Sequence, residues 1–224
     1  MTAIFISRMH FPVTTLGPGR RIGIWLQGCS IRCPGCISMD TWATDRGRTS
    51  VAQVMEMVRG WLPEAGGITL SGGEPFDQPE ALHALLKALR AESRMDVFAY
   101  SGHPYERIAG HIAAMDGLID ALMSDPYEQA TAQTLALRGS DNQRLHLLTP
   151  LGRARFASFD RPVSDAERRF DVMLDEDGAA WLAGVPARDD FRRLRFALAG
   201  AGHDAVTSED RRVVPGKRAR VEWK

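Results

Sequence analysis

Short apolar runs alternate with amphipathic segments over the first half of this 224-residue chain. Runs with the length of buried strands occupy residues 22–27, 68–71, 96–100 and 118–123. Helical spacing of apolar residues marks the segments between them, at 50–62, 79–89 and 105–115. Ser50 and Gln53 have the spacing of a capping box at the start of the first helix. The alternation predicts an α/β fold with a parallel sheet, in which the loops after the strands lie together at one edge.

The first such loop contains all three cysteines of the chain, Cys29, Cys33 and Cys36. A cubane iron–sulfur cluster has four irons and normally takes four thiolates. Three thiolates leave one iron without a protein ligand, and an open iron can bind a small molecule and pass it an electron. The CxxxCxxC spacing therefore favours a [4Fe–4S] cluster with an open iron.

The cysteines alone leave three other interpretations open. A structural zinc site would need a fourth ligand, which a distant histidine such as His10 or His103 would have to provide. A redox-active pair would use Cys33 and Cys36 and give Cys29 no role. Three inert buried cysteines fit poorly with a loop that contains glycine and proline in place of core residues.

A second motif follows the strand at 68–71. Gly72 and Gly73 allow a ligand to approach the backbone closely, with N–H groups facing it. Glu74 adds a carboxylate that can accept a hydrogen bond from an ammonium group. Taken alone, the motif would be better explained as a tight turn with a solvated glutamate. Its expected position at the same sheet edge as the cysteines favours a shared site.

The charge balance and the terminal sequence exclude several classes of partner. The formal net charge is zero, which argues against a nucleic-acid partner held by bulk electrostatics. No apolar run approaches the roughly 20 residues that cross a bilayer, and the N-terminal residues lack the pattern of a signal peptide. We expect neither a nucleic acid nor a membrane as partner. Cysteines crowded into one loop suit a reducing compartment, so the expected location is the cytoplasm.

The composition and pattern of the sequence change after residue 150. We expect a core at residues 1–150, a linker or irregular crossing at 151–169, and a small α+β appendage of unknown role at 170–224. In the appendage, apolar runs at 170–174 and 179–183 predict a hairpin around the turn 175–178, and 189–201 has the pattern of an amphipathic helix. A basic stretch with Arg211, Arg212 and Lys217 follows.

Four segments in order resemble the radical S-adenosylmethionine (SAM) superfamily. Within it the chain is most similar to the activases of glycyl-radical enzymes, the branch that serves anaerobic ribonucleotide reductase. The resemblance covers roughly residues 14–148, and the cysteine motif together with Gly72, Gly73, Glu74 and Pro75 is its most specific part. The segments are 17–29, 33–42, 70–75 and 125–144.

The resemblance implies an incomplete parallel β/α barrel of the radical SAM type, to which the C-terminal α+β appendage is added. It also implies that Cys29, Cys33 and Cys36 hold a [4Fe–4S] cluster. SAM would chelate the open iron, and Gly72, Gly73 and Glu74 would hold its methionine end. Reductive cleavage of SAM would then give a 5′-deoxyadenosyl radical, which takes a hydrogen atom from the substrate. No catalytic residue is expected beyond the cluster and the SAM site.

The resemblance implies roles for two further residues, and each of them also has a simpler structural explanation. Asp125 matches an acid that lies near SAM or a bound cation in related activases, although it could equally cap a turn before Pro126. Ser101 follows a strand and would line the ribose of SAM, although as a bare feature it is only part of a turn. Gly35 stands where many superfamily members place an aromatic residue next to the adenine.

The leading hypothesis is a radical SAM oxidoreductase that generates a glycyl radical on a partner protein. The partner would be a glycyl-radical enzyme or another protein substrate, and the electron donor a flavodoxin- or ferredoxin-like protein. The alternative enzyme modifies a different protein, peptide or small molecule, because the activases of this branch lack the 75 residues that follow position 149. The non-enzymatic alternative is an iron–sulfur or zinc-binding protein, although an electron carrier would be expected to have a fourth cysteine.

Overall fold

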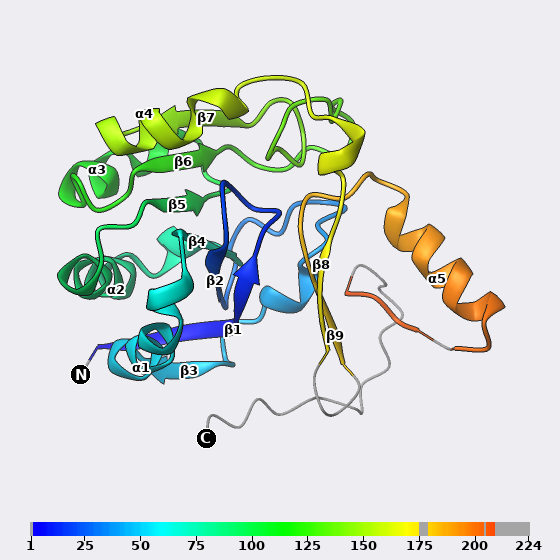
Figure 1. The fold of residues 1–224 in the computed structure, drawn as a ribbon, viewed down its shortest axis with the longest axis horizontal. Coiled ribbons are helices and arrows are strands. Elements are labelled where there is room, and N and C mark those ends of the chain that lie inside the picture. The colour runs from blue at the N-terminus through cyan, green and yellow to red at the C-terminus, as the bar shows by residue number, and fades with distance from the viewer. Residues whose placement is uncertain (1, 175–178, 204, 209–224) are drawn as a thin grey trace.

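The structure is a computed structural model that describes residues 2–174, 179–203 and 205–208. Within these residues a large mixed sheet has the strand order β3-β1-β2-β4-β5-β6-β7 (Figure 1). Its strands are β1 (Ala3–Val13), β2 (Arg21–Leu26), β3 (Arg48–Ser50), β4 (Gly67–Gly72), β5 (Val97–Tyr100), β6 (Ala121–Ser124) and β7 (Arg144–Leu147).

The centre of this sheet is parallel, as the sequence predicts. Strands β2, β4, β5 and β6 pair in parallel, while β1 pairs antiparallel with β2 and with β3, and β7 pairs antiparallel with β6. The antiparallel strands on either side were not predicted. β1 is interrupted by two register shifts and β7 has only four partly exposed residues, so neither shows a clear alternation.

Helices cover the sheet and bury its main core. They are α1 (Val51–Trp61), α2 (Pro79–Glu92), α3 (Tyr105–Ala114) and α4 (Pro150–Phe156). The predicted capping box between Ser50 and Gln53 is present at the start of α1. The apolar stripe of α2 is fully buried, as the sequence predicts, at Leu82, Leu85, Leu86 and Leu89. None of the described helices combines the length and the apolar character that a bilayer crossing requires.

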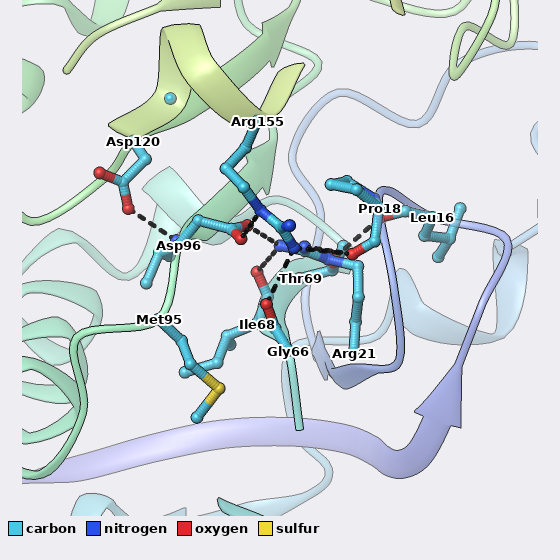
Figure 2. A network of polar contacts seen from close by, with 12 residues as sticks. Leu16, Pro18, Arg21, Gly66, Ile68, Thr69, Met95, Asp96, Asp120 and Arg155 are labelled. Carbon is cyan, nitrogen blue, oxygen red and sulfur yellow. Dashed lines mark hydrogen bonds and ion pairs between the residues drawn. The ribbon is translucent and has the colours of Figure 1, made fainter. Parts of the chain in front are cut away.

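A buried polar network fixes the amino ends of the parallel strands (Figure 2). Arg21, at the start of β2, is 0% exposed, and its Nη2 lies 2.6 Å from Asp96 Oδ1 just before β5. Arg21 Nε donates to Thr69 Oγ1 in β4 at 2.6 Å, and Nη1 donates to the carbonyl of Pro18 at 3.2 Å. Arg155 of α4 completes the network through a 2.9 Å bond from Nε to Asp96 Oδ2. The network thus joins three strands, a helix and the β1–β2 loop.

The segment 151–169, expected to be a linker or an irregular crossing, begins as part of the core. Residues up to 156 belong to α4, whose Phe156 is 0% exposed and packs against Phe98 with ring centroids 4.8 Å apart. The expectation of a boundary at 150 overlooked α4 because its seven residues are too few for a helical pattern to be recognised. The rest of the segment forms short turns, including a 3-10 turn at Asp165–Glu167.

The predicted hairpin and helix of the C-terminal unit are present. They are β8 (Asp171–Leu174), β9 (Ala180–Ala183) and α5 (Asp190–Gly200). In Figure 1 the arrowheads of β5 and β6 point towards this hairpin, and α5 lies on its far side. The predicted turn at 175–178 and the basic stretch at 211–220 lie outside the described residues.

Asp171 anchors the C-terminal unit to the core. Its carboxylate accepts hydrogen bonds from the backbone N and Oγ1 of Thr14 at 2.6 and 2.8 Å, and from the same two atoms of Thr15 at 3.1 and 2.9 Å. Both threonines belong to the β1–β2 loop, more than 150 residues away in sequence. The unit therefore has a defined place against the core.

Candidate functional site

The cysteine loop and the glycine motif lie side by side at the carboxyl edge of the sheet, as predicted. The loop follows β2, the motif follows β4, and these strands are direct neighbours. The backbone N–H of Glu74 donates to the carbonyl of Gly28 at 2.8 Å. Ser30 donates to Asp77 twice, from its backbone N at 2.7 Å and from its Oγ at 2.9 Å. These bonds hold the two loops against each other.

A small cavity of about 120 Å³ lies between the two loops, and we call it the cysteine cavity. All three cysteines line it, together with four residues that the sequence assigned to the site: Gly72, Gly73, Glu74 and Ser101. The structure therefore brings together every predicted site residue except Asp125. Trp42, Tyr127 and Gln143 also line this cavity. These three residues belong to segments that resemble the family, but the sequence pattern gave them no role.

The environment of the three thiols opposes their ionisation through burial and supports it through N–H donors. Burial raises the pKa of Cys29 and Cys33, and it raises the pKa of Cys36 to about 11. Backbone N–H groups act against this effect, from Ile31 and Arg32 at Cys29 and from Tyr127 at Cys33. Such donors stabilise thiolates and the sulfur atoms of a bound anionic cluster.

Trp42 offers a further donor to this cavity. Its buried Nε1–H has no hydrogen-bond partner at normal geometry among the described residues. The indole lies near Cys36 and lowers the pKa of that thiol. An indole N–H beside a thiol in this position suits a sulfur-rich ligand. The residues present therefore fit an iron–sulfur cluster.

The geometry gives no support to a single-ion zinc site. Within the described residues, no three His, Cys, Asp or Glu side chains are arranged to hold one metal ion. His103 Nε2 lies 3.4 Å from Asp77 Oδ1, and the ring of His10 contacts Trp25 with centroids 5.8 Å apart. The two histidines that the sequence offered as a fourth ligand thus make other contacts.

Glu74 is buried, so its interpretation as a solvated glutamate in a turn is wrong. The residue is 0% exposed. Its Oε1 accepts from the backbone N of Phe76 and from Ser101 Oγ, both at 2.9 Å, and its Oε2 accepts from the backbone N of Gly102 at 2.7 Å. Burial raises the pKa of Glu74 to about 7, and the three donors act in the opposite direction. Glu74 thereby fixes the end of β4 to the loop after β5.

The two glycines of the motif are required by close backbone packing. Gly72 has φ +106°, in the region that favours glycine. A Cβ on Gly73 would lie 2.0 Å from the carbonyl oxygen of Gly28 and 3.1 Å from that of Thr41. The approach of the cysteine loop to β4 therefore needs glycine at position 73.

Asp125 lies beside the cysteine cavity and does not line it. Arg144 Nε and Nη2 donate to its carboxylate at 2.7 and 3.0 Å, and Ser124 Oγ donates at 2.7 Å. Burial acts against ionisation, but these bonds outweigh it and lower the pKa of Asp125. Its φ of +83° is rare for a residue with a side chain. Tyr127, two residues further along the chain, does line the cavity.

A second cavity of about 490 Å³ continues from the cysteine cavity, and we call it the chamber. The two cavities share the lining residues Cys36, Ser71, Tyr100, Tyr127 and Gln143. A molecule in the chamber would therefore lie next to whatever the cysteines hold. Sequence reasoning did not predict the chamber, because residues from both ends of the chain form it.

Comparisons with known proteins agree with this site. The signature of the 4Fe-4S single cluster domain family matches residues 15–146. The chain is 29% identical over 149 residues to the anaerobic ribonucleoside-triphosphate reductase-activating protein of Escherichia coli K12. The aligned region covers 62% of this chain and 96% of the relative. It is 28% identical over 134 residues to the protein of the same name from enterobacteria phage T4. That alignment covers 58% of this chain and 85% of the relative.

A third relative has a different name. The chain is 34% identical over 103 residues to the pyruvate formate-lyase-activating enzyme of Clostridium pasteurianum, which covers 42% of this chain and 43% of the relative. The resemblance to glycyl-radical activases of the radical SAM type is thus confirmed. The matched region includes the three cysteines, the glycine motif and Ser101. This chain belongs to the 4Fe-4S single cluster domain family.

Proposed function

We propose that this protein is a radical SAM oxidoreductase that generates a glycyl radical on a partner protein. The observation that carries the proposal is the convergence of Cys29, Cys33 and Cys36 with Gly73 and Glu74 on one cavity. The names of the relatives support the same activity, since they are activating proteins and enzymes. When bound, a reduced [4Fe–4S] cluster and SAM supply a 5′-deoxyadenosyl radical that takes one hydrogen atom from the substrate.

The chain's own residues would hold and position these groups. The three thiolates would each bind a different iron of the cluster. The N–H groups of Ile31, Arg32 and Tyr127 would donate to sulfur and stabilise its negative charge.

The glycine motif and the neighbouring strand end would hold the methionine end of SAM. Gly72 and Gly73 line the cysteine cavity, and their lack of a side chain lets the neighbouring backbone pack against them. Glu74 has both oxygens engaged by protein donors, so we assign it a positioning role as well as an acceptor role. Ser101 lines the cavity beside Glu74, in keeping with a position near the ribose. Asp125 would act through the placement of Tyr127.

The finer features of this assignment are also proposals. The sheet ends at β3 on one side and at β7 on the other, which supports an incomplete β/α barrel that a protein loop can enter. A flavodoxin- or ferredoxin-like protein is the proposed electron donor, and the cytoplasm is the proposed location because it keeps thiols reduced. We propose no nucleic-acid or membrane partner.

Anaerobic reconstitution tests the proposed function. The full chain is incubated with iron and sulfide, reduced with dithionite and given SAM. We expect a brown protein that forms 5′-deoxyadenosine, and we expect Cys33→Ala to lose both the colour and the product. A colourless wild-type protein, or a coloured one that leaves SAM intact, would overturn the proposal.

The alternative enzyme, which modifies another protein, a peptide or a small molecule, keeps one specific observation in its favour. The C-terminal unit lies outside the family match at residues 15–146, and it lines the chamber. Incubation with a cognate anaerobic ribonucleotide reductase, followed by electron paramagnetic resonance, separates the two activities. A glycyl-radical signal on the reductase supports the leading proposal, and its absence together with SAM cleavage supports the alternative.

A further inference from the structure

The residues that follow the third cysteine form the last part of the cysteine loop, and we call residues 37–41 the exit segment. Local hydrogen bonds shape it: the backbone N of Ser38 donates to Cys36 Sγ at 3.4 Å, and the backbone N and Oγ1 of Thr41 donate to the carbonyl of Ser38 at 3.0 and 2.7 Å. The carbonyl of Thr41 accepts from the backbone N of Gly28 at 2.7 Å. Gly28 thus fixes one end of the exit segment, and Cys36 lies at the other end.

Arg8 of β1 holds the middle of the exit segment. Its Nη1 donates to Asp40 Oδ2 at 2.7 Å, and its side chain is only 11% exposed. The other carboxylate oxygen of Asp40 is buried and has no hydrogen-bond partner among the described residues. Since a partly buried carboxylate needs a counter-charge, the position of Asp40 depends on this guanidinium.

Trp181 of the C-terminal hairpin covers the same guanidinium. Arg8 Cζ lies 4.6 Å from the centre of the Trp181 ring and 5.5 Å from the centre of the Trp25 ring in β2. The face of an indole attracts a cation, and the attraction is stronger where water is excluded. Trp181 therefore stabilises the orientation in which Arg8 reaches Asp40.

A second contact from the C-terminal unit reaches the exit segment directly. Ser208 Oγ donates to the carbonyl of Ile37, the first residue of the exit segment. The stretch that carries Ser208 is itself bound to α5, because Arg195 donates to Thr207 Oγ1. The C-terminal unit thus contacts the exit segment twice, once directly and once through Arg8. We call these two contacts the clamp.

The clamp comes from outside the region that matches the family. The match covers residues 15–146, which include the exit segment but neither Trp181 nor Ser208. We propose that the C-terminal unit holds the exit segment through the clamp, and that the clamp keeps Cys36 in place as a ligand of the cluster. Arg8 is then a positioning residue that transmits the contact of Trp181. The proposal rests on the proposed function, since the ligand belongs to the [4Fe–4S] cluster of that site.

Hydrogen exchange of the full chain without iron tests the clamp independently of the cluster. The readout is the exchange rate of the amides of Thr41 and Trp42, which donate to carbonyls inside the exit segment. Trp181→Ala removes the aromatic cover, and Ser208→Ala removes the hydroxyl. Trp181→Phe keeps an aromatic face, and Phe196→Ala is the matched control, because Phe196 is 83% exposed on α5.

We expect the amides of Thr41 and Trp42 to exchange at least about tenfold faster in both alanine variants of the clamp than in the wild type. Trp181→Phe and Phe196→Ala should keep the wild-type rate. Amides of β4 and β5 should exchange equally in all variants, which shows that the core has kept its fold. Ser208→Ala removes a single oxygen atom, so it decides the outcome if Trp181→Ala does not fold.

Two results of the exchange experiment would overturn the proposal. One is an equal rate at Thr41 in the wild type and in the folded alanine variants. The other is a wild type whose exit segment exchanges as fast as an unstructured peptide, because the clamp would then hold nothing in place.

Iron release separates this proposal from the proposed function. After anaerobic reconstitution, the chelator bathophenanthroline disulfonate should remove iron from both alanine variants about tenfold faster than from the wild type and Phe196→Ala. Equal release from all four proteins would overturn the role of the clamp in retaining the cluster. If exchange changes as expected but the wild type takes up no iron, the proposed function fails and the clamp stands. If the wild type cleaves SAM and exchange is unchanged in the variants, the clamp fails and the proposed function stands.

Discussion

Ser101 Oγ donates a hydrogen bond of 2.9 Å to Glu74 Oε1, and this bond connects the loops after β4 and β5 within the cysteine cavity. The same hydroxyl accepts a bond from the backbone N of His103 at 3.1 Å. Ser101 is 4% exposed and Glu74 is 0% exposed, so water does not compete for either partner. The pair therefore sets the distance between two strand ends that would hold SAM.

The ionisation of Glu74 should make stability depend on pH. Burial raises its pKa from the ordinary 4.5 to about 7, so the folded state holds the proton more tightly than the unfolded chain does. This contribution to the free energy of unfolding is complete below about pH 4.5 and is lost as the pH rises to about 7. Glu74→Gln cannot ionise. The difference in unfolding free energy between wild type and Glu74→Gln should fall by about 3 kcal/mol over this interval in urea titrations. A difference that stays constant with pH contradicts this account.

Gly73→Ala should disturb the contact between the cysteine loop and β4. Its Cβ would lie 2.0 Å from the carbonyl oxygen of Gly28, so the two backbones must separate. We expect a loss of about 2 kcal/mol or more in the free energy of unfolding, and a lower iron content after reconstitution. Gly110→Ala in α3 is the control, because a Cβ there meets nothing within 4 Å. It should stabilise the protein by about 0.5–1 kcal/mol, and equal behaviour of the two variants would refute the steric argument.

The buried pair of Arg21 and Asp96 should be sensitive to the loss of one partner. Both side chains are at most 1% exposed, and Asp96→Asn leaves the guanidinium of Arg21 buried without its counter-charge. We expect Asp96→Asn to lower the free energy of unfolding by about 3–5 kcal/mol in chemical denaturation. Arg59→Ala removes the solvent-exposed pair with Glu92 and should unfold like the wild type. The network would have no special role if the two variants lost similar stability.

Asp171→Ala should release the C-terminal unit while the core stays folded. The substitution removes four hydrogen bonds from Thr14 and Thr15, and little else of the hairpin is deeply buried apart from Ala183. Limited proteolysis should then cut between residues 160 and 190 at least about tenfold faster than in the wild type. Asp189→Ala on the exposed start of α5 is the control and should leave the cleavage rate unchanged. Protection of the Asp171 variant would show that other contacts hold the unit.

Local patterns predicted the elements that build the catalytic edge of the sheet. The apolar run before Cys29 and the run before Gly72 are strong signals, because buried parallel strands are apolar on both faces. Ser50 and Gln53 form their capping box within four residues, so local sequence defines it. The meeting of the cysteines with Glu74 followed from topology, since both loops leave neighbouring parallel strands.

Contacts between distant segments could not be predicted from such local patterns. Asp125 pairs with Arg144 through β7, a strand whose four residues carry no readable alternation. Asp171 binds Thr14 across more than 150 residues, and no spacing rule connects the two positions. The chamber is lined by residues from Leu16 to Phe191, so local sequence patterns pointed to the cysteine cavity and not to the space beside it.

The Arg21 network lies at the amino ends of the strands, whereas the cysteines and the glycine motif lie at the carboxyl ends. The buried polar network and the candidate site thus lie at opposite ends of the same strands. Substitutions at the two ends, which share no contacts, should change the free energy of unfolding almost independently. A substitution in the loops at the carboxyl ends should therefore leave the Arg21 network and its contribution to stability unchanged.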